Sequence, residues 1–335
     1  FGGKGGVGKT TLSVAMALRA ATLGRKAVVL TLDPAKRLAT SLGMDSASVG
    51  DTPLDLTARL RETIPHLTGR FAAIMPDTGR TFDAFVSTLS DDPSVLQSIR
   101  RNPIFEMISR EYSGSNEYMA MVRMHQLHRT GEYDLIVLDT PPSRNAVAFL
   151  DAPQLLARFF DERMVRWFVL PTNQLFATGM RKAFGILESL TGSAFVSNLF
   201  DFGARLFDVR ARFSRDLDEI MKILRSPDCT FGMVTAPHAE AHSDFRALRE
   251  NLRDRKLGFD VLFANRLLGA IPLAAAGAIA DQSPIVLRAH DQFIRMREFE
   301  TRHLTALTRE ALREQILFSK VPELARDVHT LDDLV

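Results

Sequence analysis

The stretch that most restricts how this chain can fold is a glycine-rich run at residues 1–11, FGGKGGVGKTT. From Gly3 onward it satisfies the pattern G-x-x-x-x-G-K-[ST] of a phosphate-binding P-loop, whose backbone N–H groups surround an anion. In that pattern Lys9 places a positive charge near the β- and γ-phosphates, and Thr10 offers a hydroxyl to Mg²⁺. A helix predicted over residues 11–23 points the positive end of its dipole at the same anion. A plain glycine turn is the alternative, and the helix that follows makes it the weaker one.

The composition is typical of a globular protein, and it does not resemble that of a membrane protein or a disulfide-rich protein. Of 335 residues, 46% are hydrophobic and 24% charged, which suffices for a full core. The formal net charge of +2 is too small to indicate nucleic-acid binding by itself, although the pI is near 8.8. No run approaches the roughly 18 apolar residues of a transmembrane helix. The single cysteine, Cys229, excludes an intrachain disulfide and a Cys-x-x-Cys metal clip.

The same features lead to an expectation about location and about the start of the chain. No signal peptide is visible, so we expect a cytoplasmic protein. A strand should precede a P-loop, and the sequence starts at Phe1 rather than Met. We therefore expect sequence upstream of Phe1 to be missing.

Two apolar runs end in an aspartate where phosphate chemistry needs a carboxylate. The run RKAVVLTLD at residues 25–33 reads as a buried parallel strand, so Asp33 can orient or deprotonate a water molecule beside the P-loop. Asp33 can equally cap a helix that starts at Pro34, and both roles can hold together. The run YDLIVLDTPP at residues 133–142 has the Walker B arrangement, in which Asp139 holds Mg²⁺, usually through water.

Further strands and helices alternate along the rest of the chain. Strands are predicted at residues 230–237, 259–265 and 316–321, and helices at residues 78–89, 93–101, 115–130, 238–256 and 284–314. This alternation predicts an α/β fold with a doubly wound, mostly parallel sheet. We expect a single P-loop domain over residues 1–335, with helical insertions at about 78–130 and 154–227.

The second insertion carries an apolar helix face and many aromatic residues. Ten of the 23 phenylalanines fall in residues 159–213, and apolar residues recur at spacings of three and four from Phe202 to Leu224. A core packed on the sheet is the first interpretation, and an exposed groove for an apolar helix is the alternative. The same choice applies to the methionines at 119, 121 and 124 in the first insertion.

A second lysine in the P-loop, Lys4, gives the string KGGVGKTT at residues 4–11. That string resembles the deviant P-loop of a group of dimeric ATPases, which includes arsenite-pump, tail-anchored-protein targeting and partition ATPases. The run DPAKRL after the first strand and the run NAVAFLDAP at residues 145–153 resemble the arsenite-pump and tail-anchored branch in particular. One departure is Lys36, which stands where that branch has a His.

This resemblance implies Mg²⁺-dependent ATP hydrolysis by a homodimer, or a heterodimer with a paralogue, that closes on ATP and controls a protein client, which could be hydrophobic. Lys4 would reach across the interface to the partner's nucleotide, and Asp33 would activate water. Asn265 would bond the adenine at a strand end shared with Arg266, and Pro322 would lie against the base. The implied catalytic residues are Lys4, Lys9 and Asp33, and the implied Mg²⁺ residues are Thr10 and Asp139. The implied nucleotide-binding residues are Gly3, Gly5, Gly6, Val7, Gly8, Lys9, Thr10, Thr11, Asn265, Arg266 and Pro322.

Other departures leave the client open. The eukaryotic tail-anchored factor carries a zinc-binding Cys-x-x-Cys, and the arsenite pump binds metalloid through cysteines, but this chain has one cysteine. It also has one P-loop rather than two fused halves. We expect a prokaryotic relative with its own client. A partition or division-site ATPase that binds DNA or membrane is the rival, although the sequence shows no strong nucleic-acid signal and no integral membrane segment. A scaffold or switch with little turnover is the other alternative.

Overall fold

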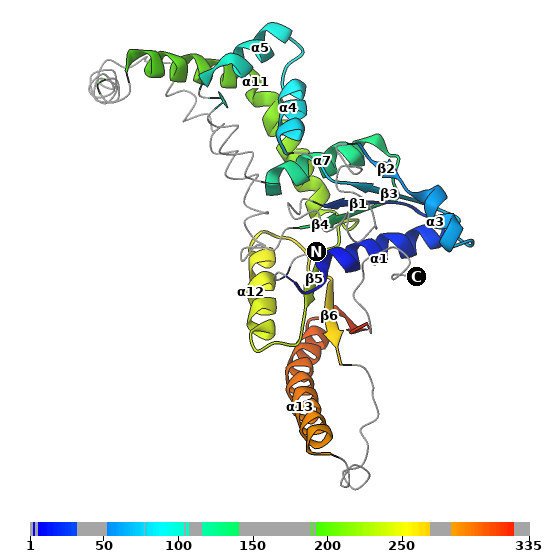
Figure 1. Cartoon of the computed structure of the whole chain (residues 1–335). Coiled ribbons are helices and arrows are strands. Elements are labelled where there is room, and N and C mark those ends of the chain that lie inside the picture. Colours follow the sequence, from blue (N-terminus) through cyan, green and yellow to red (C-terminus); the bar gives the residue numbers. More distant parts are fainter. Residues whose placement is uncertain are drawn as a thin grey trace.

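The computed structural model of this chain describes residues 3, 6–31, 52–76, 78–103, 105–106, 116–140, 189, 192–268 and 283–324. Strands and helices alternate through these ranges, as Figure 1 shows. The strands are β1 (Lys26–Thr31), β2 (Leu54–Asp55), β3 (Arg70–Ile74), β4 (Leu135–Asp139), β5 (Gly232–Thr235), β6 (Val261–Leu267) and β7 (Leu317–Pro322). The helices are α1 (Lys9–Thr22), α3 (Thr57–Thr63), α4 (Thr78–Thr88), α5 (Pro93–Arg101), α7 (Asn116–Thr130), α11 (Ser193–Arg225), α12 (Ala241–Asp254) and α13 (Pro284–Arg313).

The first sheet has the strand order β2-β3-β1-β4. β1 lies between two parallel neighbours, so that Val28 is opposite Ala72 of β3 and Ile136 of β4. β2 pairs antiparallel with β3 at the outer edge. Every residue of β1 after Lys26 is buried, as an apolar, β-branched run predicts for a strand that helices cover on both faces.

Helices cover both faces of this sheet. Ala27 and Val29 pack against α1 and α3, whereas Val28 and Leu30 pack against α7, the end of α11 and α12. The alternation follows from the two-residue period of a strand, which sends successive side chains to opposite faces. The α/β, doubly wound prediction is therefore confirmed.

The second sheet has the order β5-β6-β7, and its strands are all parallel. On one face, Phe245 of α12 and Leu307 of α13 pack with Leu262 of β6. On the other face, Leu12 of α1 packs with Val234 of β5. Helix α1 thus contacts both sheets. We predicted one sheet, and the hydrogen-bonded strands of the described chain instead form two.

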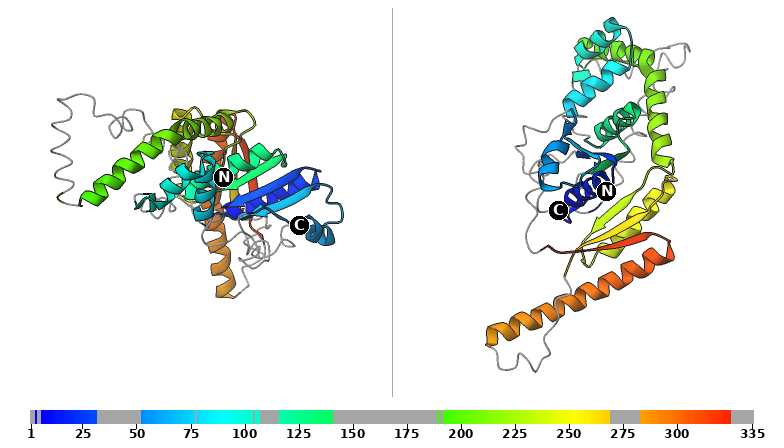
Figure 2. Two further views of the ribbon diagram at one scale, coloured as in Figure 1. Left: turned by 90° about the horizontal axis from the view of Figure 1, so that it is seen from above. Right: turned by 90° about the vertical axis from the view of Figure 1, so that its right-hand side faces the viewer.

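The described helices within the two stretches predicted as insertions, namely α4, α5, α7 and α11, extend beyond the first sheet. Figures 1 and 2 show α11 running away from the sheet toward α4 and α5. Phe202 on α11 is buried against Phe105, with 6.5 Å between the ring centroids. Met119 and Met121 of α7 are buried as well. These contacts favour the core interpretation over an exposed groove for the residues concerned. Residues 151–188 and the side chains at 206 and 213 lie outside the described part.

Helix α13 is anchored at its C-terminal half. Leu304, Leu307 and Ala311 are buried against the second sheet, whereas Ile285 and Met296 are exposed in the N-terminal half, which projects in Figure 1. Among the described helices, none combines the length and the apolar character that a membrane span requires.

Candidate active site at the P-loop

The glycine-rich run forms a tight turn that leads directly into α1. Gly8 precedes the helix with φ 89° and ψ 24°, in the left-handed region that glycine adopts without strain. A Cβ on Gly8 would lie 2.2 Å from Nδ2 of Asn265, and one on Gly3 would lie 2.2 Å from the carbonyl oxygen of Val234. Glycine is therefore needed at positions 3 and 8, because the loop lies too close to β5 and β6 to leave room for a side chain.

Lys9 lies at the first position of α1 and turns back over the loop. Its side chain is buried, and Nζ donates a hydrogen bond of 2.9 Å to the carbonyl oxygen of Gly3. The ammonium group therefore lies inside the turn that the glycines form. Thr10 and Thr11 follow in the first turn of the helix, where the backbone N–H groups and the helix dipole favour an anion.

Asp139 ends β4 beside this loop and is only 1% exposed. Its Oδ2 accepts hydrogen bonds from the hydroxyl of Thr10 at 2.6 Å and from the hydroxyl of Thr31 at 2.9 Å. Its Oδ1 is buried and has no hydrogen-bond partner among the described residues. Burial raises the pKa of Asp139, and the two hydroxyl donors and the charge of Lys9 act in the opposite direction.

These oxygen atoms fit a hard divalent cation. Mg²⁺ prefers carboxylate, hydroxyl and water oxygens, and it is commonly held by one or two protein groups together with phosphates. The free Oδ1 of Asp139 and the adjacent hydroxyl of Thr10 are such donors, brought together from β4 and α1. A buried carboxylate oxygen without a partner is costly unless something else binds it.

Asn265 attaches the loop to the second sheet. Its Nδ2 donates a hydrogen bond of 2.8 Å to the carbonyl oxygen of Val7. The pairing of β6 with β7 is irregular between Ala264 and Leu267, and Arg266 within this interval has φ 57°. Such a bulge redirects side chains at the end of a strand. Arg266 is exposed there, and Pro322 of β7 pairs with Leu267.

The structure thus brings several predicted residues together and leaves others outside its described part. Gly3, Gly8, Lys9, Thr10, Asp139 and Asn265 surround one loop. Lys4, Gly5 and Asp33 lie outside the described residues, as do residues 141–150 that follow the second aspartate. Their predicted roles therefore stay predictions.

Thr31 belongs to this site but was not predicted. It lies opposite Asp139 in the pairing of β1 with β4, is 1% exposed, and donates to the Asp139 carboxylate. The sequence shows a polar residue near the end of an apolar strand, two positions before Asp33. That position was the available signal, because ends of neighbouring parallel strands meet at one edge of a sheet.

Comparison with known proteins agrees with this geometry. Residues 1–274 match the family described as anion-transporting ATPase. A candidate arsenical pump-driving ATPase of Aquifex aeolicus is 30% identical over 172 residues, which cover 48% of this chain and 51% of that protein. An uncharacterized protein of Streptomyces coelicolor is 26% identical over 267 residues, covering 79% of this chain and 61% of that protein. ATPase get3 of Aspergillus terreus is 26% identical over 157 residues, which cover 47% of this chain and 43% of that protein.

The chain spans about half of the length of the curated relatives that it matches, and somewhat more of the Streptomyces protein. The family match, in contrast, covers most of the chain and includes the P-loop, Asp139 and Asn265. The chain therefore belongs to the anion-transporting ATPase family.

Proposed function

We propose that this protein is a Mg²⁺-dependent ATP hydrolase in which ATP closes a dimer and thereby controls binding of a protein client. The observation that carries the ATPase part is the contact of Thr10 with Asp139 next to the buried Lys9. A P-loop lysine, a hydroxyl and a strand-end carboxylate at one place are the parts that position a nucleoside triphosphate and its metal.

Each described residue has a defined task in this proposal. The ammonium of Lys9, now bonded to the Gly3 carbonyl, exchanges that partner for phosphate oxygens, with which it forms charge-assisted hydrogen bonds. Thr10 and Asp139 hold Mg²⁺, which supplies positive charge to the phosphates when bound. Thr31 keeps the Asp139 carboxylate oriented toward the loop. Asp33, which lies outside the described residues, would orient or deprotonate the attacking water.

The nucleoside end of the site is assigned to the second sheet. Asn265 can donate and accept at once, so its amide suits the edge of adenine. One donor of this amide bonds the carbonyl oxygen of Val7, so in this proposal the same side chain would connect the base site with the phosphate loop. Arg266 and Pro322 lie at neighbouring strand ends, where they would complete the site around the base.

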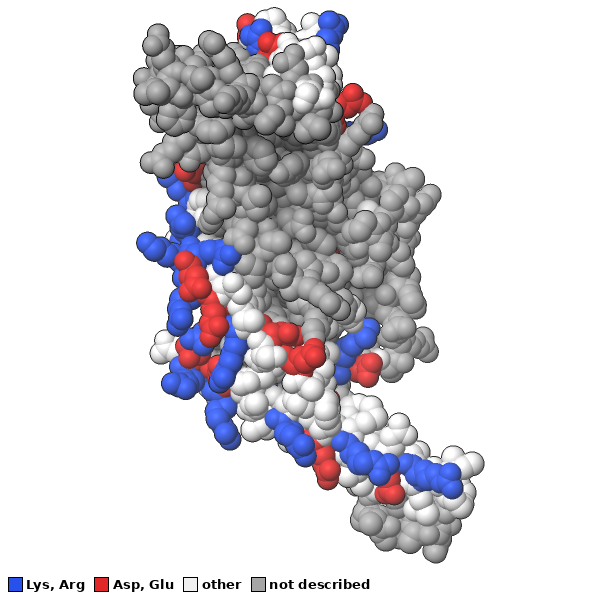
Figure 3. All heavy atoms as spheres, turned by 90° about the vertical axis from the view of Figure 1, so that its left-hand side faces the viewer, with Lys and Arg blue, Asp and Glu red and all other residues white. Residues whose placement is uncertain are grey.

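The described residues on the face shown in Figure 3 do not form the basic surface that a DNA-binding rival needs. On the face shown in Figure 3, Lys and Arg side chains are interspersed with Asp and Glu over the described residues. Helix α12 illustrates the pattern, because Arg246, Arg249 and Arg253 alternate with Asp244, Glu250 and Asp254. Nonspecific binding of DNA draws its affinity from clustered positive charge that neutralises phosphates. We therefore retain a protein client.

The catalytic proposal is tested by separating ATP binding from turnover. Asp33→Asn should bind ATP with unchanged affinity and hydrolyse it at least about 100-fold more slowly, because general-base assistance is worth about 10² to 10⁴. Lys9→Ala should weaken ATP binding by about 10- to 100-fold, the size of a lost charged hydrogen bond. Binding is measured by calorimetry with Mg²⁺ and a non-hydrolysable analogue, and turnover by phosphate release.

Lys222→Ala is the matched control, since this exposed lysine lies on α11 and away from the P-loop. It should bind and hydrolyse ATP as the unmodified protein does. Wild-type turnover by Asp33→Asn would remove the proposed role of that residue. Unchanged ATP affinity in Lys9→Ala would contradict the site itself.

A further inference from the structure

The carboxyl end of β6 is bent at the residues that the proposed function assigns to the base. β6 pairs regularly with β7 as far as Ala264 opposite Lys320, and the next pair is Leu267 opposite Pro322. β6 therefore advances three residues where β7 advances two, which leaves one extra residue in a β-bulge. Arg266 lies in this interval with φ 57°, in the left-handed region that a residue other than glycine adopts only when its surroundings hold it there.

Two hydrogen bonds fix the chain directly after the bulge. The backbone N–H of Glu323 donates to the carbonyl oxygen of Leu267 at 2.7 Å, which continues the pairing with β7. The backbone N–H of Leu268 donates to Oε2 of Glu300 on α13, also at 2.7 Å. A bond to a carboxylate is about twice as strong as one between neutral groups. Glu300 thus ties the end of β6 to a helix rather than to the next strand.

Glu300 is itself held in place by the anchored half of α13, which packs along β6 and β7 (Figure 1). Glu300, Leu304 and Leu307 follow one another at spacings of four and three, so they lie on one face of the helix. Leu304 packs with Leu267 of β6, and Leu307 is fully buried against the second sheet. The packing of these two leucines therefore sets where the carboxylate meets Leu268.

The side chain that the bulge presents to the P-loop tolerates little displacement. Nδ2 of Asn265 donates to the carbonyl oxygen of Val7 at 2.8 Å, and a Cβ added to Gly8 would lie 2.2 Å from the same nitrogen. Asn265 directly follows Ala264, the last residue before the bulge that is paired with β7. One end of the bulge is therefore fixed by the strand pairing, and the other end by the bonds that follow it.

We propose that Glu300 is a positioning residue for the base end of the nucleotide site. It contacts neither phosphate nor base. Its carboxylate holds Leu268, and the bulge then keeps Asn265 and Arg266 where they meet the base. The phosphate end does not depend on this carboxylate, because Lys9 and the metal-binding oxygens are held by the loop and the first sheet. This inference rests on the proposed function, in which Asn265 and Arg266 bind the base.

Binding of a whole nucleotide and of its phosphate part alone separates this role from a general loss of structure. The ligands are a non-hydrolysable ATP analogue and inorganic tripolyphosphate, each with Mg²⁺, and calorimetry measures their affinities. Glu300→Ala should bind the ATP analogue about 10-fold more weakly, the lower end for a lost hydrogen bond to a charged group, and should bind tripolyphosphate as before. Glu300→Gln keeps an oxygen that accepts from Leu268, so it should restore most of the affinity.

The choice of base gives a second readout, because it depends on the polar groups that meet the edge of the base. The preference of Glu300→Ala for the ATP analogue over the corresponding GTP analogue should fall. The same substitution should have a smaller effect on ATP-analogue affinity when it is added to Asn265→Ala, since both then act on one contact. Glu298→Ala is the matched control, because this exposed glutamate lies on the same helix. It should bind every ligand as the unmodified protein does.

Unchanged affinity of Glu300→Ala for the ATP analogue would overturn the proposal. So would an equal loss of tripolyphosphate binding, which indicates general damage, or a Glu300→Gln protein as weak as Glu300→Ala. Full additivity with Asn265→Ala would show that Glu300 does not act through that amide. An unmodified protein that binds neither the ATP analogue nor tripolyphosphate would contradict the proposed function itself, and this inference with it.

Discussion

Thr31 shows how much the proposed metal site depends on one hydroxyl that binds no substrate. It donates to the same oxygen of Asp139 as Thr10 does, but from β1 rather than from α1. Thr31→Val keeps the side-chain shape, so the strand should form normally, but the carboxylate loses one of its two donors. We expect ATP turnover to fall about 10-fold, the lower end for groups that orient metal ligands.

The loss should be partly recovered at high Mg²⁺, because the defect lies in holding the metal. The measurement is phosphate release as a function of Mg²⁺ concentration, with ATP affinity in the absence of metal as the control. An unchanged Mg²⁺ dependence would contradict the proposed role of Thr31. A variant that loses metal-free ATP binding would indicate damage to the loop instead.

The close contact between Gly8 and Asn265 leads to a second prediction about single residues. Gly8→Ala should destabilise the protein in two ways: by roughly 1–2 kcal/mol for a left-handed Ala, and by a clash with Nδ2 of Asn265 at 2.2 Å. Asn265→Ala removes the clash but leaves the backbone cost. The loss of stability from Gly8→Ala should therefore be smaller in the Asn265→Ala background, by about 1 kcal/mol.

Thermal unfolding of the four proteins of this cycle measures the coupling. Gly131→Ala is the comparison, because Gly131 has φ 63° and no atom within 4 Å of an added Cβ. Gly131→Ala should lower the free energy of unfolding only by the cost of a left-handed alanine, and this loss should be the same with Asn265 and with Asn265→Ala. Equal costs for Gly8→Ala and Gly131→Ala in both backgrounds would mean that the loop does not touch Asn265.

At the residue scale, local spacing in the sequence was enough to select residues that the structure brings together, although their roles stay predictions. Lys9 and Thr10 were identified because the P-loop places them at fixed offsets from glycines, and Asp139 because it ends an apolar strand. The bonds of Thr31 to Asp139 and of Asn265 to Val7 join residues 108 and 258 positions apart. No local pattern encodes such pairs.

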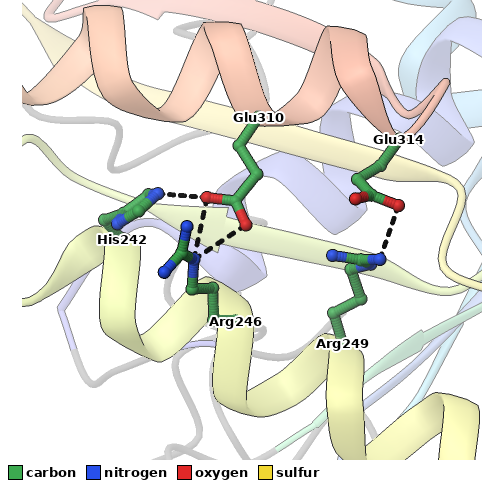
Figure 4. Close-up of polar contacts among 5 residues, drawn as sticks. All are labelled: His242, Arg246, Arg249, Glu310 and Glu314. Atoms are coloured by element: carbon green, nitrogen blue, oxygen red, sulfur yellow. Dashed lines mark hydrogen bonds and ion pairs between the residues drawn. The ribbon is translucent and has the colours of Figure 1, made fainter.

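At the scale of elements, hydrogen bonds and ion pairs between partly buried and exposed side chains join α12 to α13, as Figure 4 shows. Glu310 of α13 bonds His242 and Arg246 of α12, and Glu314 bonds Arg249 at 2.5 Å. Burial by itself would raise the pKa of Glu310, but the bonds with Arg246 and His242 hold it below its ordinary value of 4.5. The charged form is thus favoured in the folded protein.

This shift makes the stability of the protein depend on pH. A carboxyl group whose pKa is lowered by folding stabilises the fold above its unfolded pKa, and the contribution is lost as pH falls through the folded pKa. Glu310→Gln should therefore lower the free energy of unfolding by about 1–2 kcal/mol at pH 7. The difference from the unmodified protein should shrink below pH 4.5.

Urea unfolding followed by circular dichroism at pH 7 and at pH 3.5 measures this difference. Glu298→Gln on the exposed surface of the same helix is the control and should change stability little at either pH. A Glu310→Gln defect of equal size at both pH values would show that packing, rather than charge, fastens the two helices.

Elements with a strong periodic pattern were predicted within a few residues, and the weakly patterned ones were missed. α13 was expected at residues 284–314 and runs over Pro284–Arg313. β3 (Arg70–Ile74) was not predicted, although it pairs with β1 in the middle of the sheet. Its sequence RFAAI is short and contains two alanines, which have low β-propensity. The extended conformation of β3 is therefore set by its pairing with β1 and by the burial of its side chains, rather than by its own sequence.

At the scale of the whole molecule, the apolar patterns in the sequence predicted that certain side chains are buried. They did not predict whether these side chains are buried in the protein's own core or in contact with a client. Phe202 and the α7 methionines could have formed either a core or a client groove, and the described side chains are in the core. The proposed client would therefore have to bind through other residues. Exposed apolar side chains on the projecting half of α13, such as Ile285 and Met296, show that helical periodicity alone does not distinguish a buried apolar face from an exposed one.

The dimer is the last prediction, and it concerns the assembly rather than the site within one chain. A lysine that completes the partner's site adds nothing to ATP affinity within a single subunit but stabilises charge that develops during hydrolysis. Lys4→Ala should therefore bind ATP normally and lose turnover by about 10³-fold, as does removal of a charge supplied in trans. Sedimentation should show that Mg²⁺ and a non-hydrolysable analogue convert monomers to dimers in the unmodified protein. Lys222→Ala should behave as the unmodified protein in both assays. A protein that stays monomeric with the analogue while it hydrolyses ATP at full rate would exclude closure of a dimer as the basis of its activity.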